Sequence, residues 1–140
     1  FASQRLNDEM AVINQKKQAT IKKVESEINE ESLLVFAKND NNLQNGKKIF
    51  DEKCAVCHLQ DGGGLIGPNL TDNYWIHGGS LMDIRNVILK GVPAKGMVPW
   101  EGVLSSQEVK EVVSYVHSLR GTTPATPKQA EGEEFIYQNL

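Results

Sequence analysis

The sequence predicts an all-α fold in which short helices, joined by loops rich in glycine and proline, form a single domain. Three segments, near residues 43–54, 80–91 and 105–121, repeat apolar residues at the three- and four-residue spacing of a helix face. No segment with the two-residue period of a strand precedes Cys54. A chain of 140 residues is long enough for one core and short for two.

The first 40 residues are polar and carry only a narrow apolar stripe at helical spacing. Its members are Met10, Ile13, Ile21, Val24 and Ile28. Because this stripe is too weak to be a core by itself, residues 1–40 are predicted to be a polar helical spacer or membrane-tether segment. A partner-binding helix is the alternative.

The first helix of the domain is expected from about Leu43 to Cys54, with Gly46 and Phe50 on its buried side. Glycine inside a helix costs about 1 kcal/mol relative to alanine. We therefore expect another backbone to approach Gly46 closely.

Two further helices carry start and stop signals. Ser80 with Asp83, and Ser105 with Glu108, form capping pairs at their starts, and glycines stand at their ends. Their predicted buried faces contain Leu81, Ile84, Val87 and Ile88, and then Val109, Val112, Val113, Val116 and Leu119. The domain is thus predicted to span residues 41–121, and residues 122–140, which are polar and acidic, to form a flexible tail.

Composition limits the possible partners. Lys and Arg number 15 against 18 Asp and Glu, so a surface that binds nucleic acid is not expected. The longest apolar run, Leu33 to Ala37, is far below the roughly 20 residues needed to cross a bilayer. The chain starts at Phe1 rather than Met, and we expect any membrane association to use an anchor upstream that this chain lacks.

The stretch "CAVCH", from Cys54 to His58, contains both cysteines of the chain and ends in a histidine. Zinc, a redox dithiol and covalent haem c all use two cysteines separated by two residues. The sequence lacks the second, regularly spaced pair of ligands that a zinc site needs. It also lacks the strand that normally precedes a redox dithiol. A histidine directly after the second cysteine is the attachment signature of haem c, which we predict to be bound through Cys54 and Cys57.

His58 is accordingly the predicted proximal ligand of the iron. Its other ring nitrogen should donate to a carbonyl, and Pro68 in the loop "GPNL" is the candidate acceptor. For the sixth ligand, Met97 in the loop "GVPAKGMVPW" is favoured over Met10 in the spacer and Met82 beside core positions.

Three aromatic residues with a polar hydrogen, Tyr74, Trp75 and Trp100, could form the wall of the cofactor pocket and reach the haem propionates, or could simply pack. His77 and His117 are predicted to lie at the surface or the pocket edge rather than to bind iron. No catalytic triad or carboxylate pair stands out.

Together, "GKKIF" before "CAVCH", "GPNL", "KGMVPW" and "VSYVHSL" resemble class I c-type cytochromes over residues 41–121. That family folds as short helices wrapped around one covalently attached haem c, and the resemblance implies that Gly46 and Phe50 meet Tyr115 where the first and last helices cross. "GPNLTDNYWIHGGS" and "DIRNVILKGVPAKGMVPWEGVLS" are more specifically similar to the CcoP/FixP subunit of cbb3-type cytochrome c oxidases.

This resemblance implies an electron-transfer domain on the periplasmic side of a bacterial inner membrane, not an enzyme by itself. Electrons would come from a donor cytochrome or a quinol-oxidising complex and pass towards the oxygen-reducing oxidase subunit. The alternatives are a free-standing carrier in the soluble periplasm, and a haem enzyme or gas sensor in which Met97 does not bind iron.

Overall fold

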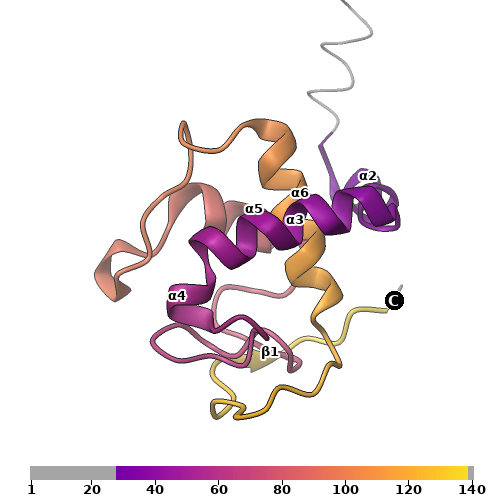
Figure 1. Ribbon diagram of the computed structural model, residues 1–140. Helices are drawn as coiled ribbons and strands as arrows, with labels where there is room; N and C mark the ends of the chain where they lie inside the picture. The colour runs from indigo at the N-terminus through magenta and orange to yellow at the C-terminus, as the bar shows by residue number, and fades with distance from the viewer. Residues whose placement is uncertain (1–27, 139–140) are drawn as a thin grey trace, which may run out of the picture.

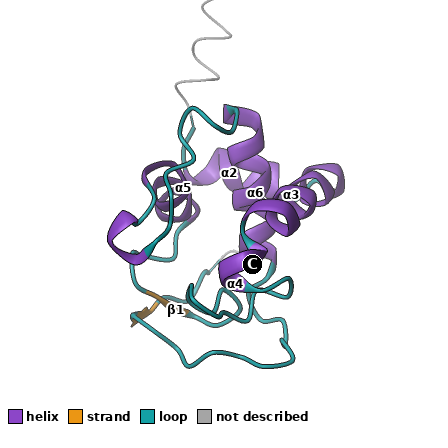
Figure 2. Cartoon of the chain, turned by 60° about the vertical axis from the view of Figure 1, so that its left-hand side comes forward, coloured by secondary structure: helices purple, strands orange, loops and turns teal. Residues whose placement is uncertain are grey.

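The computed structural model describes residues 28–138, which form a mainly helical domain with one very short sheet (Figures 1 and 2). In chain order the elements are α2 (Glu30–Ala37), α3 (Asp40–Lys53), α4 (Ala55–His58), β1 (Tyr74–Trp75), α5 (Leu81–Lys90), the 3-10 helix η1 (Pro93–Lys95), α6 (Ser106–Ser118) and β2 (Glu133–Glu134). No helix within these residues is long and apolar enough to span a membrane. The predicted all-α class is confirmed.

Helices α3 and α6 cross in close contact, as Figure 1 shows. A Cβ atom on Gly46 would overlap the backbone carbonyl of Glu111 and lie 2.9 Å from the Cβ of Tyr115. The rings of Phe50 and Tyr115 lie beside this point, with centroids 5.3 Å apart. The crossing therefore explains the glycine inside α3, and the expected contact of Gly46 and Phe50 with Tyr115 is confirmed.

The capping pairs start α5 and α6 as predicted. Ser80 Oγ accepts from the N–H of Asp83 at 3.0 Å, and Ser105 Oγ accepts from the N–H of Glu108 at 3.1 Å. The Asp83 and Glu108 carboxylates accept in return from the N–H groups of the two serines. Each capping box satisfies backbone donors that a helix start leaves free.

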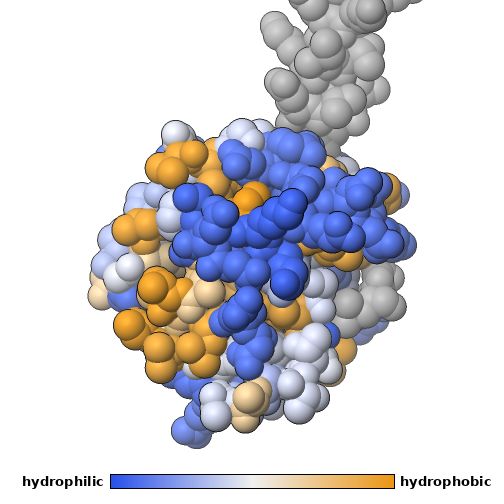
Figure 3. All heavy atoms as spheres, viewed as in Figure 1, coloured by the Kyte–Doolittle hydropathy of each residue, from blue (hydrophilic) through white to orange (hydrophobic). Residues whose placement is uncertain are grey.

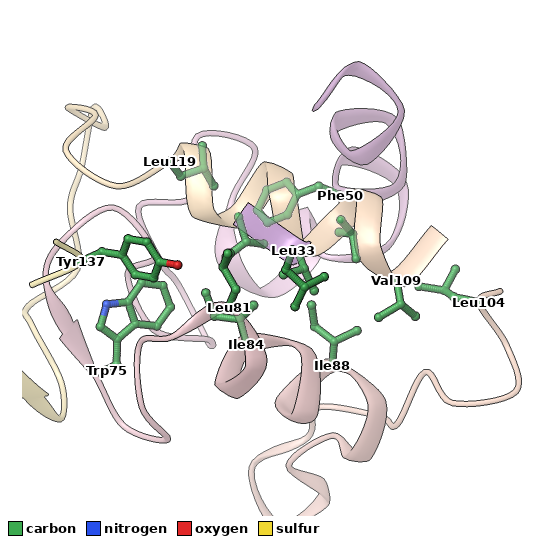
Figure 4. Packing of buried hydrophobic residues seen from close by; sticks show 13 residues of the cluster. Leu33, Phe50, Trp75, Leu81, Ile84, Ile88, Leu104, Val109, Leu119 and Tyr137 are labelled. Atoms are coloured by element: carbon green, nitrogen blue, oxygen red, sulfur yellow. The ribbon is translucent and has the colours of Figure 1, made fainter. Parts of the chain in front are cut away.

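The hydrophobic core lies between α2, α3, α5 and α6 (Figure 4). Phe50, Leu81, Val112 and Val113 have no exposed surface. In Figure 4, Trp75 and Tyr137 lie together at one end of the cluster and Leu104 lies at the other. The chain beyond the predicted domain thus contributes to the same core.

The predicted boundary at residue 41 is wrong, because α2 is part of the domain. Leu33 is 1% exposed, and α2 packs against both α5 and α6. Both carboxylate oxygens of Glu30 are used at the start of α5, where they accept from the N–H groups of Leu81 and Met82 at 2.9 Å. The stripe from Met10 to Val24 lies outside the described residues.

The prediction of a flexible tail after Gly121 is also wrong for residues 122–138. The N–H of Lys128 donates to the carbonyl of Gly63 at 2.8 Å, and β2 pairs with β1 in antiparallel register. The Tyr137 side chain is 7% exposed, and its hydroxyl donates to Glu30 at 2.6 Å. The polar composition of this segment did not reveal that the side chains of Phe135 and Tyr137 pack against the hydrophobic core.

Candidate cofactor site

A mainly apolar cavity of about 420 Å³ lies beside α4, bounded by β1, α5 and the loop that carries Met97. All the residues predicted for the site line it: Cys54, Cys57, His58, Pro68, Tyr74, Trp75, Met97 and Trp100. Segments as far apart as residues 54 and 100 therefore converge on one hollow. Such a cavity, apolar with few polar groups, is typical of a cofactor site.

The short helix α4 presents the cysteines on the cavity wall. Cys54 ends α3, and its carbonyl accepts from the N–H groups of Cys57 at 3.1 Å and His58 at 3.0 Å, which closes one helical turn. The two thiols are not joined in a disulfide. Burial and the neighbouring Cys57 raise the pKa of Cys54 to about 11. Redox dithiols instead depend on a lowered thiol pKa, so this environment disfavours a redox dithiol.

The His58 ring is fixed by the loop that follows it. Its Nδ1 lies 2.8 Å from the carbonyl oxygen of Pro68, and since a carbonyl only accepts, Nδ1 carries the hydrogen and Nε2 keeps a free lone pair. Burial lowers the pKa of His58, which favours the neutral ring. A Cβ on Gly67 would lie 2.5 Å from Cε1 of His58, so only glycine lets the loop pass this close to the ring.

Met97 also lines the cavity, in a loop fixed by backbone hydrogen bonds. The N–H of Val92 donates to the Met97 carbonyl at 2.9 Å, and the N–H of Met97 donates to the Val92 carbonyl at 3.2 Å. The N–H of Trp100 donates to the Ile88 carbonyl at 3.0 Å, which ties the end of the loop to α5. Met82 does not line the cavity.

The three aromatic residues of the wall differ in their surroundings. Trp75 is 9% exposed, and its Nε1 is buried without a hydrogen-bond partner among residues 28–138. Tyr74 is 38% exposed, and its hydroxyl donates to Glu134 at 3.2 Å, so this hydrogen is already used by the protein. Trp100 lies under the ammonium of Lys53, 5.6 Å from the ring centroid.

Much of the apolar lining was predicted only as helical core. The lining residues predicted as core are Phe50, Ile84, Val87, Ile88 and Val116, and the loop residues Leu70 and Val92 line the cavity as well. The helical stripes revealed that most of these side chains are buried, but not that they face a cofactor. His77 lies at the cavity edge, as predicted. The prediction for His117 is wrong: it is 6% exposed and its ring packs edge-on against Tyr137, which covers it.

The donor set and the cavity fit a haem c. Two thiols stand one helical turn apart, and a thioether also lines the cavity. Among residues 28–138, Nε2 of His58 and the indole N–H of Trp75 have no hydrogen-bond partner. A carboxylate of haem would accept a hydrogen bond from the Trp75 indole N–H. Without an acceptor, a buried donor of this kind costs free energy.

Several apolar side chains at the cavity are open to solvent. Val56 is 77% exposed, Ile66 is 69% exposed and Val98 is 55% exposed, and all three line the cavity. Figure 3 shows apolar surface gathered beside the hydrophilic exposed face of α3. The cavity is thus enclosed by the core on one side and reaches an apolar surface on the other.

Comparison with known proteins gives a consistent family. The family described as "Cytochrome C oxidase, cbb3-type, subunit III" matches residues 41–116. The cbb3-type cytochrome c oxidase subunit FixP of Azorhizobium caulinodans is 36% identical over 103 residues, 67% of this chain and 35% of that protein. Subunit CcoP of Azospirillum sp. is 32% identical over 123 residues, 79% of this chain and 40% of that protein.

Among solved structures, cytochrome cL from Methylophaga aminisulfidivorans superposes with a TM-score of 0.57 at 23% identity, covering 61% of this chain and 57% of that one. This likeness shows the cytochrome c fold. The chain spans well under half the length of the FixP and CcoP relatives. Since the family match covers more than half of the 140 residues, the chain belongs to the family of cbb3-type cytochrome c oxidase subunit III.

Proposed function

We propose that this chain is an electron-transfer haem c domain of a cbb3-type oxidase subunit, relaying electrons towards the oxygen-reducing subunit. The observation that carries the proposal is the convergence of Cys54, Cys57, His58 and Met97 on one cavity. The domain itself would catalyse no reaction on a substrate.

The chain's residues would hold the cofactor in distinct ways. The thiols of Cys54 and Cys57 would each add across a vinyl group to form a thioether bond. His58, oriented by the Pro68 carbonyl, would bind the iron through Nε2, and the Met97 sulfur would supply the second protein ligand. A bound haem would supply a one-electron Fe(III)/Fe(II) couple.

The surroundings of the cavity support transfer of electrons rather than binding of a small ligand. The apolar side chains of α5 and α6 keep water from the buried side, and the loop hydrogen bonds between Val92 and Met97 hold the thioether in place. A thioether ligand favours Fe(II) and raises the reduction potential. The exposed apolar side chains at the rim offer an exit for electrons towards a partner.

The partners follow from the relatives' names, which identify them as oxidase subunits. We propose oxidase subunits as acceptors and a donor cytochrome or a quinol-oxidising complex as the source. The domain would lie on the periplasmic side of a bacterial inner membrane, tethered through a segment that precedes the described residues.

The test uses native membranes. After mild solubilisation and separation of complexes, the polypeptide with this sequence should stain for covalent haem in a denaturing gel and co-migrate with oxygen-reducing activity. A variant with serine at both Cys54 and Cys57 is the control and should lose the stain. A haem-stained polypeptide found only in the soluble periplasmic fraction would contradict the oxidase role and identify a diffusing carrier. A polypeptide without covalent haem would contradict the proposal altogether.

A further inference from the structure

An arginine just beyond α6 is buried behind the cavity wall. Arg120 is 7% exposed, and its guanidinium carbon lies 4.6 Å from the ring centroid of Trp75, 5.1 Å from that of Tyr137 and 5.9 Å from that of Phe135. We call these three rings the aromatic cage. Their π faces attract the guanidinium cation electrostatically.

Arg120 has few other partners. Its Nη2 donates to the carbonyl of Gly79, whereas Nε and Nη1 are buried without a hydrogen-bond partner in the described part of the chain. It forms no ion pair within residues 28–138. Glu30 acts on it electrostatically, but the Glu30 carboxylate already accepts from Tyr137 and from two backbone N–H groups of α5.

The arginine stays charged in this environment. Burial lowers the pKa of Arg120 to about 10, which is still well above neutral pH. A positive charge shielded from water acts on its surroundings more strongly than a solvated one, because the local dielectric constant is lower.

Trp75 connects the cation with the cavity. Trp75 lines the cavity, Arg120 does not, and the guanidinium packs on the Trp75 ring. Arg120 therefore lies one residue behind the wall against which we place the haem. A fixed positive charge there opposes the additional positive charge of Fe(III) and favours Fe(II).

We propose that the positive charge of Arg120, acting from behind Trp75, raises the reduction potential of the haem iron, and that Phe135 and Tyr137 shield this charge from water. This inference rests on the proposed function, since it requires the haem. It assigns a role to the C-terminal segment, which lies beyond the residues 41–116 that the family match covers.

The test is the reduction potential of the haem-loaded full chain, measured by optical redox titration in the wild type and in Arg120→Met. We expect the ratio of Fe(II) to Fe(III) at a fixed ambient potential to fall about three- to tenfold in the variant. Tenfold corresponds to about 59 mV for a one-electron couple. Arg120→Lys, which keeps the charge, should restore most of the wild-type potential.

Lys110→Met is a matched control. Lys110 lies in α6 with its ammonium 5.0 Å from the centroid of the Phe36 ring, so it also packs on an aromatic ring, but it does not line the cavity. Its removal changes the net charge by the same amount and should leave the potential unchanged. Equal potentials in the wild type, Arg120→Met and Lys110→Met would overturn the inference, as would Arg120→Lys behaving like Arg120→Met.

A second variant keeps the inference testable if Arg120→Met does not fold. Phe135→Leu keeps the cation but opens the aromatic cage to water, and should lower the potential in the same direction by a smaller amount; an unchanged potential in this variant would overturn the part assigned to the cage. A wild type that lacks covalent haem or the Met97 ligand would instead refute the proposed function, so the two failures are distinguishable in the visible spectrum.

Discussion

Single residues decide how the site's two candidate iron ligands are held. Gly67 lets the loop with Pro68 pass against the His58 ring, and the Pro68 carbonyl fixes which nitrogen of His58 stays free. Met97 is held differently, by a backbone bridge to Val92. The sequence pattern named these candidate ligands, and the structure adds the contacts that orient their side chains and backbone.

Replacing Met97 with alanine should open the sixth position of the iron. We expect the ferrous variant to bind carbon monoxide and its potential to fall, because the thioether that favours Fe(II) is gone. The absorption spectrum under carbon monoxide and a redox titration measure both effects. Met82→Ala is the control, since Met82 packs on the core but does not line the cavity. Full binding of carbon monoxide by the ferrous wild type would refute Met97 as ligand and favour a gas sensor.

At the scale of elements, α2 is the part of the fold that the sequence pattern assigned to the wrong role. Its apolar run is short, and only Leu33 and Ala37 are buried. It nevertheless contacts α3, α5 and α6, because Leu33 enters the core and the Glu30 carboxylate accepts from the first N–H groups of α5. A helix with so narrow a stripe is indistinguishable from a solvated spacer until its neighbours are known.

Leu33→Ala should therefore destabilise the domain as a core substitution does. We expect the free energy of unfolding to fall by about 2 to 5 kcal/mol, because the side chain is fully buried and leaves a cavity. Denaturant unfolding followed by far-UV circular dichroism measures the loss. Val35→Ala, at a side chain that is 67% exposed in the same helix, should change stability by less than about 0.5 kcal/mol. Equal effects of the two variants would show that α2 does not contribute to the core.

Across the whole molecule, the two ends of the described chain meet behind the cavity. Tyr137 donates to Glu30, its ring packs on His117, and β2 pairs with β1 next to Trp75. Residues more than 100 positions apart thus form one polar cluster, in which His117, Arg120 and Tyr137 are buried and Glu30 is partly buried. This arrangement makes the stability of the domain depend on pH.

Burial and the Arg120 cation lower the pKa of His117 to about 4 from its ordinary value of 6.5, against the opposing effect of Glu30. Since the unfolded chain then binds the proton more readily, stability is full above about pH 6.5 and is lost as the pH falls towards 4. We expect a loss of about 2 to 3 kcal/mol between pH 7 and pH 4.5. Denaturant unfolding of the haem-loaded protein across this range measures it.

The variant His117→Phe keeps an aromatic ring against Tyr137 and should show a smaller dependence of stability on pH in this range. His77→Asn, at an exposed histidine, should retain the wild-type dependence. If His117→Phe loses stability with falling pH as steeply as the wild type, another group is responsible for the pH dependence.

The sequence by itself determined the local features of this protein. The capping pairs at Ser80 and Ser105 mark where α5 and α6 start, and "CAVCH" with the loop prolines names the residues that converge on the cavity. These signals are short-range: hydrogen bonds within one turn, and cofactor chemistry that requires residue types at fixed spacing. They also identify the family.

Only the tertiary structure decided where the domain begins and ends. The packing of Leu33 and Tyr137 depends on partners far away in the chain, and a few apolar residues in a polar segment do not reveal whether such partners exist. The same holds for Arg120, which stands in the sequence as one more cation at a helix end. Its burial follows from the return of the C-terminal segment past Trp75, a contact that no local pattern encodes.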